Sequence, residues 1–386
     1  MKRAVMIGAG QIGRGFIGML LEQAGYHVVF ADLNMEVIDD INTRHEYTVH
    51  LVDTQCVNTR VSNISAMSSL DPRLIGEYEQ CQLVCTAVGL TSLPKIAGPI
   101  ARGIAARRAA GSTEYMNVIA CENAVRGSSQ LKALVEQQLS PEDLAYARQY
   151  VGFPDCAVDR IIPPAHGIEA AEVVVEKYHE WDVEKKDFRG PLPEIAGMEL
   201  VDDLTAYLER KLFTLNGANV VTGAIAYLKG YRTVNEALKD EEIYSLVLGL
   251  MEECSAMLEK RHGFSPKSMA DYRASLMQRF MNPYIIDEAV RVVREPIRKL
   301  FATDRLVAPM NYAHSYGIAT PHYYRGIASV LLYDNPEDEQ SIQMQALIRS
   351  LGLRPALEQI SGVPAESAVA VSIEQEYEKL KEALGK

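Results

Sequence analysis

A lysine and two asparagines within nine residues form the most chemically suggestive stretch of this chain, since residues 211–219 read KLFTLNGAN. A neutral lysine amine accepts a proton from an alcohol, and carboxamide N–H groups donate to the oxygen that is left. Lys211, Asn216 and Asn219 therefore indicate metal-free chemistry between an alcohol and a ketone. The competing interpretation is a solvated polar face, but the apolar residues 220–228 favour a buried helix whose polar groups need partners.

The spacing of these three residues raises a geometric problem. At about 100° per residue, an ideal helix places Lys211, Asn219 and Asn216 near 0°, 80° and 140°, on one broad face. Helical side chains tilt toward the N-terminus, so Lys211 leans away from the two amides. Convergence on one atom therefore requires a bend or unwinding, which Gly217 would permit. The alternative is a substrate that lies along the helix.

Far upstream, residues 8–13 read GAGQIG, between an apolar run at 3–7 and a helical period at 14–24. This strand–loop–helix context is typical of a dinucleotide-binding fold. The first glycine permits a tight turn, the second lets the backbone approach a pyrophosphate, and the third lets helix and strand pack closely. Cofactor contacts are predicted for Gly8, Gly10, Gln11, Ile12 and Gly13.

Asp32 follows a second predicted strand at residues 26–31 and lies 19 residues after Gly13. A carboxylate at this position accepts hydrogen bonds from the adenine-ribose hydroxyls and repels a 2′-phosphate. The sequence therefore predicts NAD rather than NADP as the cofactor. The competing interpretation is a turn residue before Asn34.

Two further predicted strands, residues 82–88 and 117–121, end at loops that should face the cofactor, because ligands lie beyond the carboxyl ends of strands in such sheets. Thr86, Val88 and Asn123 are therefore predicted cofactor contacts. Asn123 is also a candidate donor to a substrate oxygen near the nicotinamide. Alternatively it caps a helix that starts near Ala124, and the sequence leaves both interpretations open.

A basic segment at residues 294–305 carries four cations in an otherwise acidic chain. Such a cluster binds phosphate or carboxylate well, which predicts substrate contacts for Arg294, Arg298, Lys299 and Arg305. The competing interpretation is a solvated basic face that balances acidic neighbours. His50 and His322 are weaker candidates, for which we expect structural roles.

The length of 386 residues favours two domains. We expect an α/β fold: an N-terminal Rossmann-type, doubly wound domain over residues 1–193, followed by a mostly α-helical domain over 194–386. Strand signals at 158–162 and 172–181 are expected to extend the first sheet, and residues 190–193 are the best linker.

Composition narrows the class of partner. The formal net charge of −12 argues against nucleic acid, and no apolar run is long enough for a membrane span. The six cysteines include no CxxC pair, which predicts reduced thiols in a cytoplasmic protein and no metal centre. An anionic substrate would need a local basic pocket.

Taken in order, these residues are similar to the polyol-specific long-chain dehydrogenases/reductases, nearly end to end. The strings that carry the resemblance are IGAGQIGRGFIG (7–18), FAD (30–32), RH (44–45), TAVG (86–89), ACEN (120–123), VRG (125–127), AVDRI (157–161), GMEL (197–200), ERKLFTLN (209–216), PIRKL (296–300) and DRL (304–306). Within the family, the chain most resembles members that interconvert D-mannitol 1-phosphate and D-fructose 6-phosphate. The resemblance implies an NAD-linked, metal-independent enzyme that is a monomer or weak oligomer.

The resemblance also implies residue roles. Lys211 matches the family's general base, and Asn123 and Asn216 match the amides that hold the reacting oxygen. Asn219 departs from the pattern, because it stands where the family usually has a histidine. Residues 216–218 (NGA) and 226–230 (AYLKG) resemble the hexuronate members, the tagaturonate and fructuronate reductases. A shifted substrate, or an NAD-binding sugar-phosphate sensor with weak catalysis, are therefore the alternatives.

Overall fold

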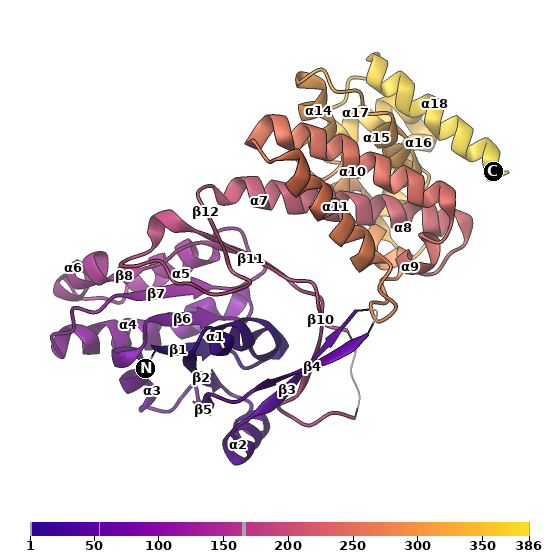
Figure 1. Ribbon diagram of the computed structural model, residues 1–386. Coiled ribbons are helices and arrows are strands. Elements are labelled where there is room, and N and C mark those ends of the chain that lie inside the picture. The colour runs from indigo at the N-terminus through magenta and orange to yellow at the C-terminus, as the bar shows by residue number, and fades with distance from the viewer. Residues whose placement is uncertain (1, 54, 164–166, 386) are drawn as a thin grey trace. The chain divides into compact units, whose positions relative to one another are not determined.

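The computed structural model describes residues 2–53, 55–163 and 167–385. Contacts within the chain divide it into two units, Met1–Tyr207 and Leu208–Lys386 (Figure 1). The division falls inside α7 (Leu204–Arg210), further along the chain than the boundary expected at residue 193. The reason is β12 (Glu199–Val201), which pairs with β11 (Glu180–Glu184) and so keeps the chain in the first unit beyond the expected linker.

The first unit is built on a six-stranded sheet in which every neighbouring pair is parallel. In spatial order, its strands are β5 (Ile64–Ser68), β2 (Tyr26–Asp32), β1 (Lys2–Ile7), β6 (Leu83–Thr86), β7 (Met116–Ala120) and β8 (Val151–Gly152). The order reverses between β1 and β6. This is the predicted doubly wound sheet, and a reversal point is where such sheets bind ligands, beyond the carboxyl ends of the strands.

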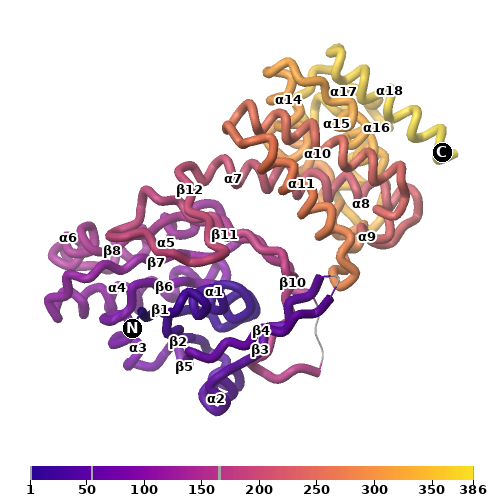
Figure 2. Tube along the Cα trace, viewed as in Figure 1, coloured from indigo at the N-terminus to yellow at the C-terminus, as the bar shows by residue number. Residues whose placement is uncertain are grey.

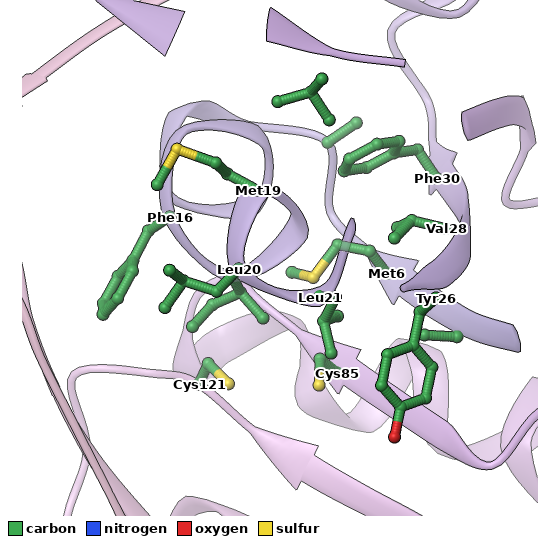
Figure 3. Close-up of a cluster of buried hydrophobic side chains, with 14 of the residues drawn as sticks. Met6, Phe16, Met19, Leu20, Leu21, Tyr26, Val28, Phe30, Cys85 and Cys121 are labelled. Atoms are coloured by element: carbon green, nitrogen blue, oxygen red, sulfur yellow. The ribbon is translucent and has the colours of Figure 1, made fainter. Parts of the chain in front are cut away.

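Helices cover both faces of this sheet, because successive residues of each central strand point to opposite sides. Met6 of β1 belongs to one apolar core and Val5 to the other. Figure 3 shows part of the first core, whose members include Met6, Phe16, Leu21 and Phe30. The helices of this unit are η1 (Gly13–Gly18), α1 (Met19–Gln23), α2 (Met35–Arg44), α3 (Leu74–Gln80), η2 (Leu90–Ser92), α4 (Leu93–Ala109), α5 (Gly127–Glu136), α6 (Pro141–Tyr150) and η3 (Lys185–Asp187).

The strand signals at 158–162 and 172–181 do not extend the large sheet, so that prediction was wrong. The second signal contains parts of two strands, β10 (Val173–Glu176) and β11, and they enter two separate three-stranded sheets. One sheet has the order β10, β3 (Tyr47–Val52), β4 (Cys56–Val61), and the other has the order β12, β11, β9 (Cys156–Asp159). Apolar alternation reports that a strand has a buried face, and it does not report which strand lies beside it.

The second unit is helical in all its described elements. One helix runs through α7, the π-helical segment η4 (Lys211–Asn216) and α8 (Gly217–Lys229), as the trace in Figure 2 shows. The remaining helices are α9 (Val234–Ala237), α10 (Glu241–His262), α11 (Pro266–Phe280), α12 (Ala289–Val293), α13 (Pro296–Lys299), α14 (Val307–Ser315), α15 (Pro321–Leu331), α16 (Glu339–Leu351), α17 (Leu353–Ser361) and α18 (Ala368–Ala383).

Helix α8 is the centre of the helical unit. It packs against α10, α12 and α15, and ten of its thirteen residues are buried. The apolar run that follows Asn219 therefore lies in the core, as the sequence indicated. None of the helices in the described part of the chain is both long and apolar enough to cross a membrane.

Candidate active site

The loop after β1 has the geometry that its three glycines suggested. Gly8 has φ = +94°, and a Cβ there would collide with the carbonyl oxygen of Ala87. A Cβ on Gly13 would collide with the carbonyl oxygen of Gly8, so the helix start lies directly on the loop. Gly10 is different, because a Cβ there would meet no atom within 4 Å. Gly8 and Gly13 are thus required by close packing, whereas Gly10 borders open space at a helix N-terminus, which suits a pyrophosphate.

A buried arginine lies under this loop and was not singled out in the sequence. Arg14 donates to the carbonyl oxygen of Ala9 through Nη1, to Ala171 at 2.9 Å and to Ala170 at 3.2 Å. Burial lowers the pKa of its guanidinium, against opposing effects that include nearby Asp32. The loop is therefore held from below by a cation. A positive group beside a helix N-terminus strengthens the attraction for an anion.

Asp32 is engaged with both the loop and its own turn. Its Oδ2 accepts the N–H of Ala9 at 2.5 Å, and its Oδ1 accepts the N–H groups of Leu33 and Asn34 at 2.7 and 2.9 Å. The turn interpretation and the cofactor interpretation are therefore compatible. A carboxylate has about four acceptor sites, so Asp32 retains capacity for a ribose hydroxyl.

Glu122 organises the neighbouring loop, another role that the sequence did not reveal. Its carboxylate is buried and accepts the Thr86 hydroxyl at 2.8 Å, the Val88 N–H at 2.9 Å and the Gly89 N–H at 2.8 Å. Thr86 and Val88, both predicted cofactor contacts, are thus fixed at the carboxyl end of β6. The sequence feature that could have identified this role is a carboxylate directly after a predicted buried strand.

Asn123 follows Glu122 and is exposed. Helix α5 begins only at Gly127, its N-cap is Arg126, and no side chain caps it. Asn123 therefore does not cap this helix, which was the alternative that the sequence left open. Its carboxamide stays available at the edge where β6 and β7 end.

In the helical unit, Lys211 and Asn216 are the two ends of the π-helical segment η4. A π-helix has i→i+5 hydrogen bonds, so residues five apart lie about one turn apart along the helix. The wide turn therefore brings Lys211 and Asn216 closer in direction than the roughly 140° that separates them in an ideal α-helix. The departure from α-helix lies in residues 211–216 themselves. Gly217 instead allows close packing, since a Cβ there would lie 2.9 Å from the carbonyl oxygen of Arg305.

Residues before and within η4 are tied firmly to α10 and α11. Glu209 accepts from Arg261 at 2.6 and 3.0 Å and pairs with His262 at 2.6 Å. Burial would raise the pKa of Glu209, but these two partners outweigh it and the pKa is lowered. The guanidinium of Arg210 lies 4.4 Å from the ring centre of Tyr272. Lys211 thus extends from a helix whose preceding turn is anchored by side chains.

Asn219 is oriented by an acidic partner. Its Nδ2 lies 3.3 Å from Oδ2 of Asp287, whose other oxygen pairs with Arg291. The Oδ1 atom of Asn219 is buried and has no hydrogen-bond partner among residues 2–53, 55–163 and 167–385. This amide therefore presents an unused acceptor.

The basic segment folds around one carboxylate. Asp304 pairs with Arg305 at 2.6 Å and lies 3.9 Å from Arg298, which also bonds Glu295 at 3.1 Å. Lys299 is only 5% exposed and donates to the carbonyl oxygen of Val292 at 2.5 Å.

Burial lowers the pKa of Lys299 to about 7, and the nearby charges of Arg305 and Arg298 add to this effect. Arg294 is exposed. The structure therefore gathers Arg298, Lys299 and Arg305, of which Arg298 is exposed like Arg294. The Gly217–Arg305 contact places this segment beside the end of η4.

The two candidate histidines have structural partners. His50 pairs with Asn58 at 2.8 Å and with Glu172 at 3.3 Å, across the β3 sheet. His322 pairs with the partly buried Glu253 at 2.6 Å at the start of α15. These contacts account for both residues, as expected.

Two family models match almost the whole chain. The model described as the mannitol dehydrogenase Rossmann domain matches residues 2–197, and the model described as the mannitol dehydrogenase C-terminal domain matches residues 203–381.

Solved structures with similar folds include two polyol dehydrogenases. A substrate-free D-sorbitol dehydrogenase has a TM-score of 0.80 at 16% identity, over 99% of this chain and 93% of the other. The mannitol 2-dehydrogenase of Pseudomonas fluorescens, in a ternary complex with NAD and D-mannitol, has a TM-score of 0.65 at 20% identity, over 100% and 94%. At these identities the likeness concerns the fold.

Proposed function

Because both family models match and together span residues 2–197 and 203–381, the chain belongs to the mannitol dehydrogenase family, and we propose that it is an NAD-dependent polyol dehydrogenase. The observation that carries this proposal is the π-helical turn that presents Lys211 and Asn216 on one face of an otherwise buried helix. Short π-helical segments occur frequently at functional sites.

The first unit supplies the cofactor site in this proposal. The residues that would hold NAD are the loop Gly8, Gly10, Gln11, Ile12 and Gly13, the carboxylate Asp32, and Thr86, Val88 and Asn123. The open space at Gly10 and the spare acceptor capacity of Asp32 fit a pyrophosphate and a ribose. NAD, when bound, supplies the acceptor for the hydride that leaves the alcohol carbon.

The side chains handle the proton and the oxygen. Lys211 takes the proton of the alcohol during oxidation and returns it during ketone reduction. Asn216 and Asn123 donate carboxamide N–H groups to the oxygen as its negative charge develops, each worth roughly 3 kcal/mol in the transition state. This division of roles needs no metal ion.

For the substrate, we propose the pair D-mannitol 1-phosphate and D-fructose 6-phosphate, the reaction of a mannitol-1-phosphate 5-dehydrogenase. Support comes from Arg298 and Arg305, which Asp304 holds together near Gly217. A guanidinium has five N–H donors, so the bonds to Asp304 leave donors for a phosphate. Lys299 and Arg294 would add positive potential at the same segment.

A hexuronate substrate is the second candidate, and Asn219 is the observation that favours it. An amide fixed by Asp287 stands where the family usually has a titratable imidazole. A keto-uronate such as tagaturonate or fructuronate would bring its carboxylate to the basic segment in place of a phosphate.

One assay separates these possibilities. NADH oxidation is followed with fructose 6-phosphate, fructose, tagaturonate and fructuronate, for the wild type, Arg298→Gln and the exposed control Arg349→Gln. The proposal expects fructose 6-phosphate to be the best substrate, and Arg298→Gln alone to raise its KM roughly tenfold, the effect of about 1.4 kcal/mol. Better turnover of fructose or a hexuronate would reject the phosphate assignment. Binding of NADH and sugar phosphate without turnover would indicate a sensor.

A further inference from the structure

The pairing of Asn219 with Asp287 joins two residues that are 68 positions apart in the chain. Asp287 is 8% exposed and lies just before α12, which packs against α8. Its backbone carbonyl accepts the N–H of Val234 at 2.9 Å, and its Oδ1 pairs with Arg291. The carboxylate is therefore held in place by contacts that do not involve Asn219.

This arrangement determines which way the amide of Asn219 points. A carboxylate paired with an arginine is ionised and only accepts hydrogen bonds, so the nitrogen of Asn219 must face it. The oxygen of the same amide is then turned away from Asp287. It is a buried acceptor without a donor in the described part of the chain, and such atoms are rare in native proteins unless a ligand or water satisfies them.

The position of this acceptor connects it with the reacting groups. Asn219 follows Asn216 by three residues on the same helix, and residues with this spacing are neighbours on one face. The required donor must carry a hydrogen, which excludes an ionised carboxylate or a fully ionised phosphate at this point. An alcohol O–H has the right chemistry.

We propose that Asp287 is a positioning residue that turns the Asn219 carbonyl oxygen toward the substrate, where it accepts a hydrogen bond from a hydroxyl of the polyol or ketose. This inference rests on the proposed dehydrogenase function. It defines a hydroxyl subsite on α8, separate from the basic segment that takes the anionic end.

A charge swap tests the pairing. In Asn219→Asp two carboxylates face each other, and kcat/KM should fall at least tenfold through KM. In the double variant Asn219→Asp/Asp287→Asn, the amide at 287 donates to one oxygen of the carboxylate at 219, which leaves the other oxygen as the substrate acceptor. We expect the double variant to recover kcat/KM to within about threefold of the wild type, since a factor of three is well under 1.4 kcal/mol.

A second readout distinguishes substrate contact from a structural role. The wild type is assayed with monodeoxy analogues of its best ketose, and one analogue should lose tenfold or more in kcat/KM. In Asn219→Ala, that analogue should no longer have a lower kcat/KM than the parent ketose, and the other analogues should keep their wild-type ratios. A purely structural role of Asn219 would leave all these ratios unchanged. Thermal unfolding of each variant reports folding, and the Asn219→Ala comparison stands even where Asn219→Asp is unfolded.

The two proposals fail in different ways. If the wild type fails to oxidise NADH with every ketose and keto-uronate tested, the proposed function is overturned. An active wild type whose double variant stays as impaired as Asn219→Asp, while folded, overturns the Asp287 inference and leaves the dehydrogenase proposal standing.

Discussion

Glu122 accepts a hydrogen bond of 2.8 Å from the Thr86 hydroxyl, and the same buried carboxylate accepts hydrogen bonds from the N–H groups of Val88 and Gly89. These bonds tie the loop after β6 to the loop after β7, at the sheet edge where the proposed cofactor binds. One side chain thus fixes the conformation of two loops.

Replacement of Glu122 by Gln should loosen both loops. The amide nitrogen of Gln must face an N–H or a hydroxyl, so at least one of the three donors loses its acceptor, at a cost of about 1 kcal/mol. We expect a lower free energy of unfolding and roughly tenfold weaker NADH binding, measured by denaturant titration and NADH fluorescence. Glu142→Gln, at an exposed position of α6, is the control. Unchanged NADH affinity would show that the loop does not contact the cofactor.

Asp32 should set the preference between NADH and NADPH. Asp32→Ala removes the negative charge that repels a 2′-phosphate and the acceptor for a ribose hydroxyl. The ratio of kcat/KM values for NADPH and NADH should rise by about tenfold or more, which corresponds to at least about 1.4 kcal/mol. Asp39→Ala, exposed on α2, is the matched control. If both variants keep the wild-type ratio, Asp32 serves only the turn and the Ala9 N–H.

Lys211→Met should abolish turnover while NADH still binds. Methionine keeps the length of the side chain and removes the proton acceptor, and loss of a general base costs typically 10²–10⁴-fold in rate. Stopped-flow measurement of hydride transfer with the best ketose, together with NADH titration, separates chemistry from binding. Lys267→Met, at a lysine whose side chain is 88% exposed, should retain full activity. Residual turnover close to the wild type would assign the proton transfer to another group.

Lys299 should make stability depend on pH in a defined direction. Its pKa in the folded protein is about 7, below the ordinary value of 10.5, because the side chain is buried. Between these values the unfolded chain binds more protons at this residue, so the stability of the wild type rises with pH across the window. Lys299→Met lacks this contribution. Its stability relative to the wild type should therefore fall as pH rises from 7 to 10.5, in urea titrations. A difference that is constant across the window would contradict burial of the cation.

The parts of the fold that the sequence predicted are those with local signals. The conformation of the GAGQIG loop can be predicted from its own residues and the apolar strands around it. Only glycine fits at Gly8 and Gly13, because a Cβ there would collide with neighbouring backbone. The pairing of β10 with β3 has no such signal, since it depends on which strand edge is free. The extra sheets were therefore missed, although the strand character of their residues was recognised.

The same distinction applies to the candidate site. The residue types at Lys211 and Asn216 predicted a chemistry, but the π-helical turn that relates them depends on packing along the whole helix. The partner of Asn219 is 68 residues away, and no local pattern identifies Asp287. Likewise, the four cations of the basic segment were visible, whereas the burial of Lys299 and the central position of Asp304 follow from tertiary structure.

The π-helical segment at Lys211–Asn216 also constrains how this helix can change. A turn with one additional residue shifts the register of everything after it by about 100° relative to an uninterrupted α-helix. Deletion of a single residue in this segment would restore regular α-helix and leave the buried side of α8 facing α10, α12 and α15, because it removes the same 100° that the wide turn absorbs. The apolar interior of the helical unit thus tolerates loss of the wide turn, whereas the relation between Lys211 and Asn216 does not.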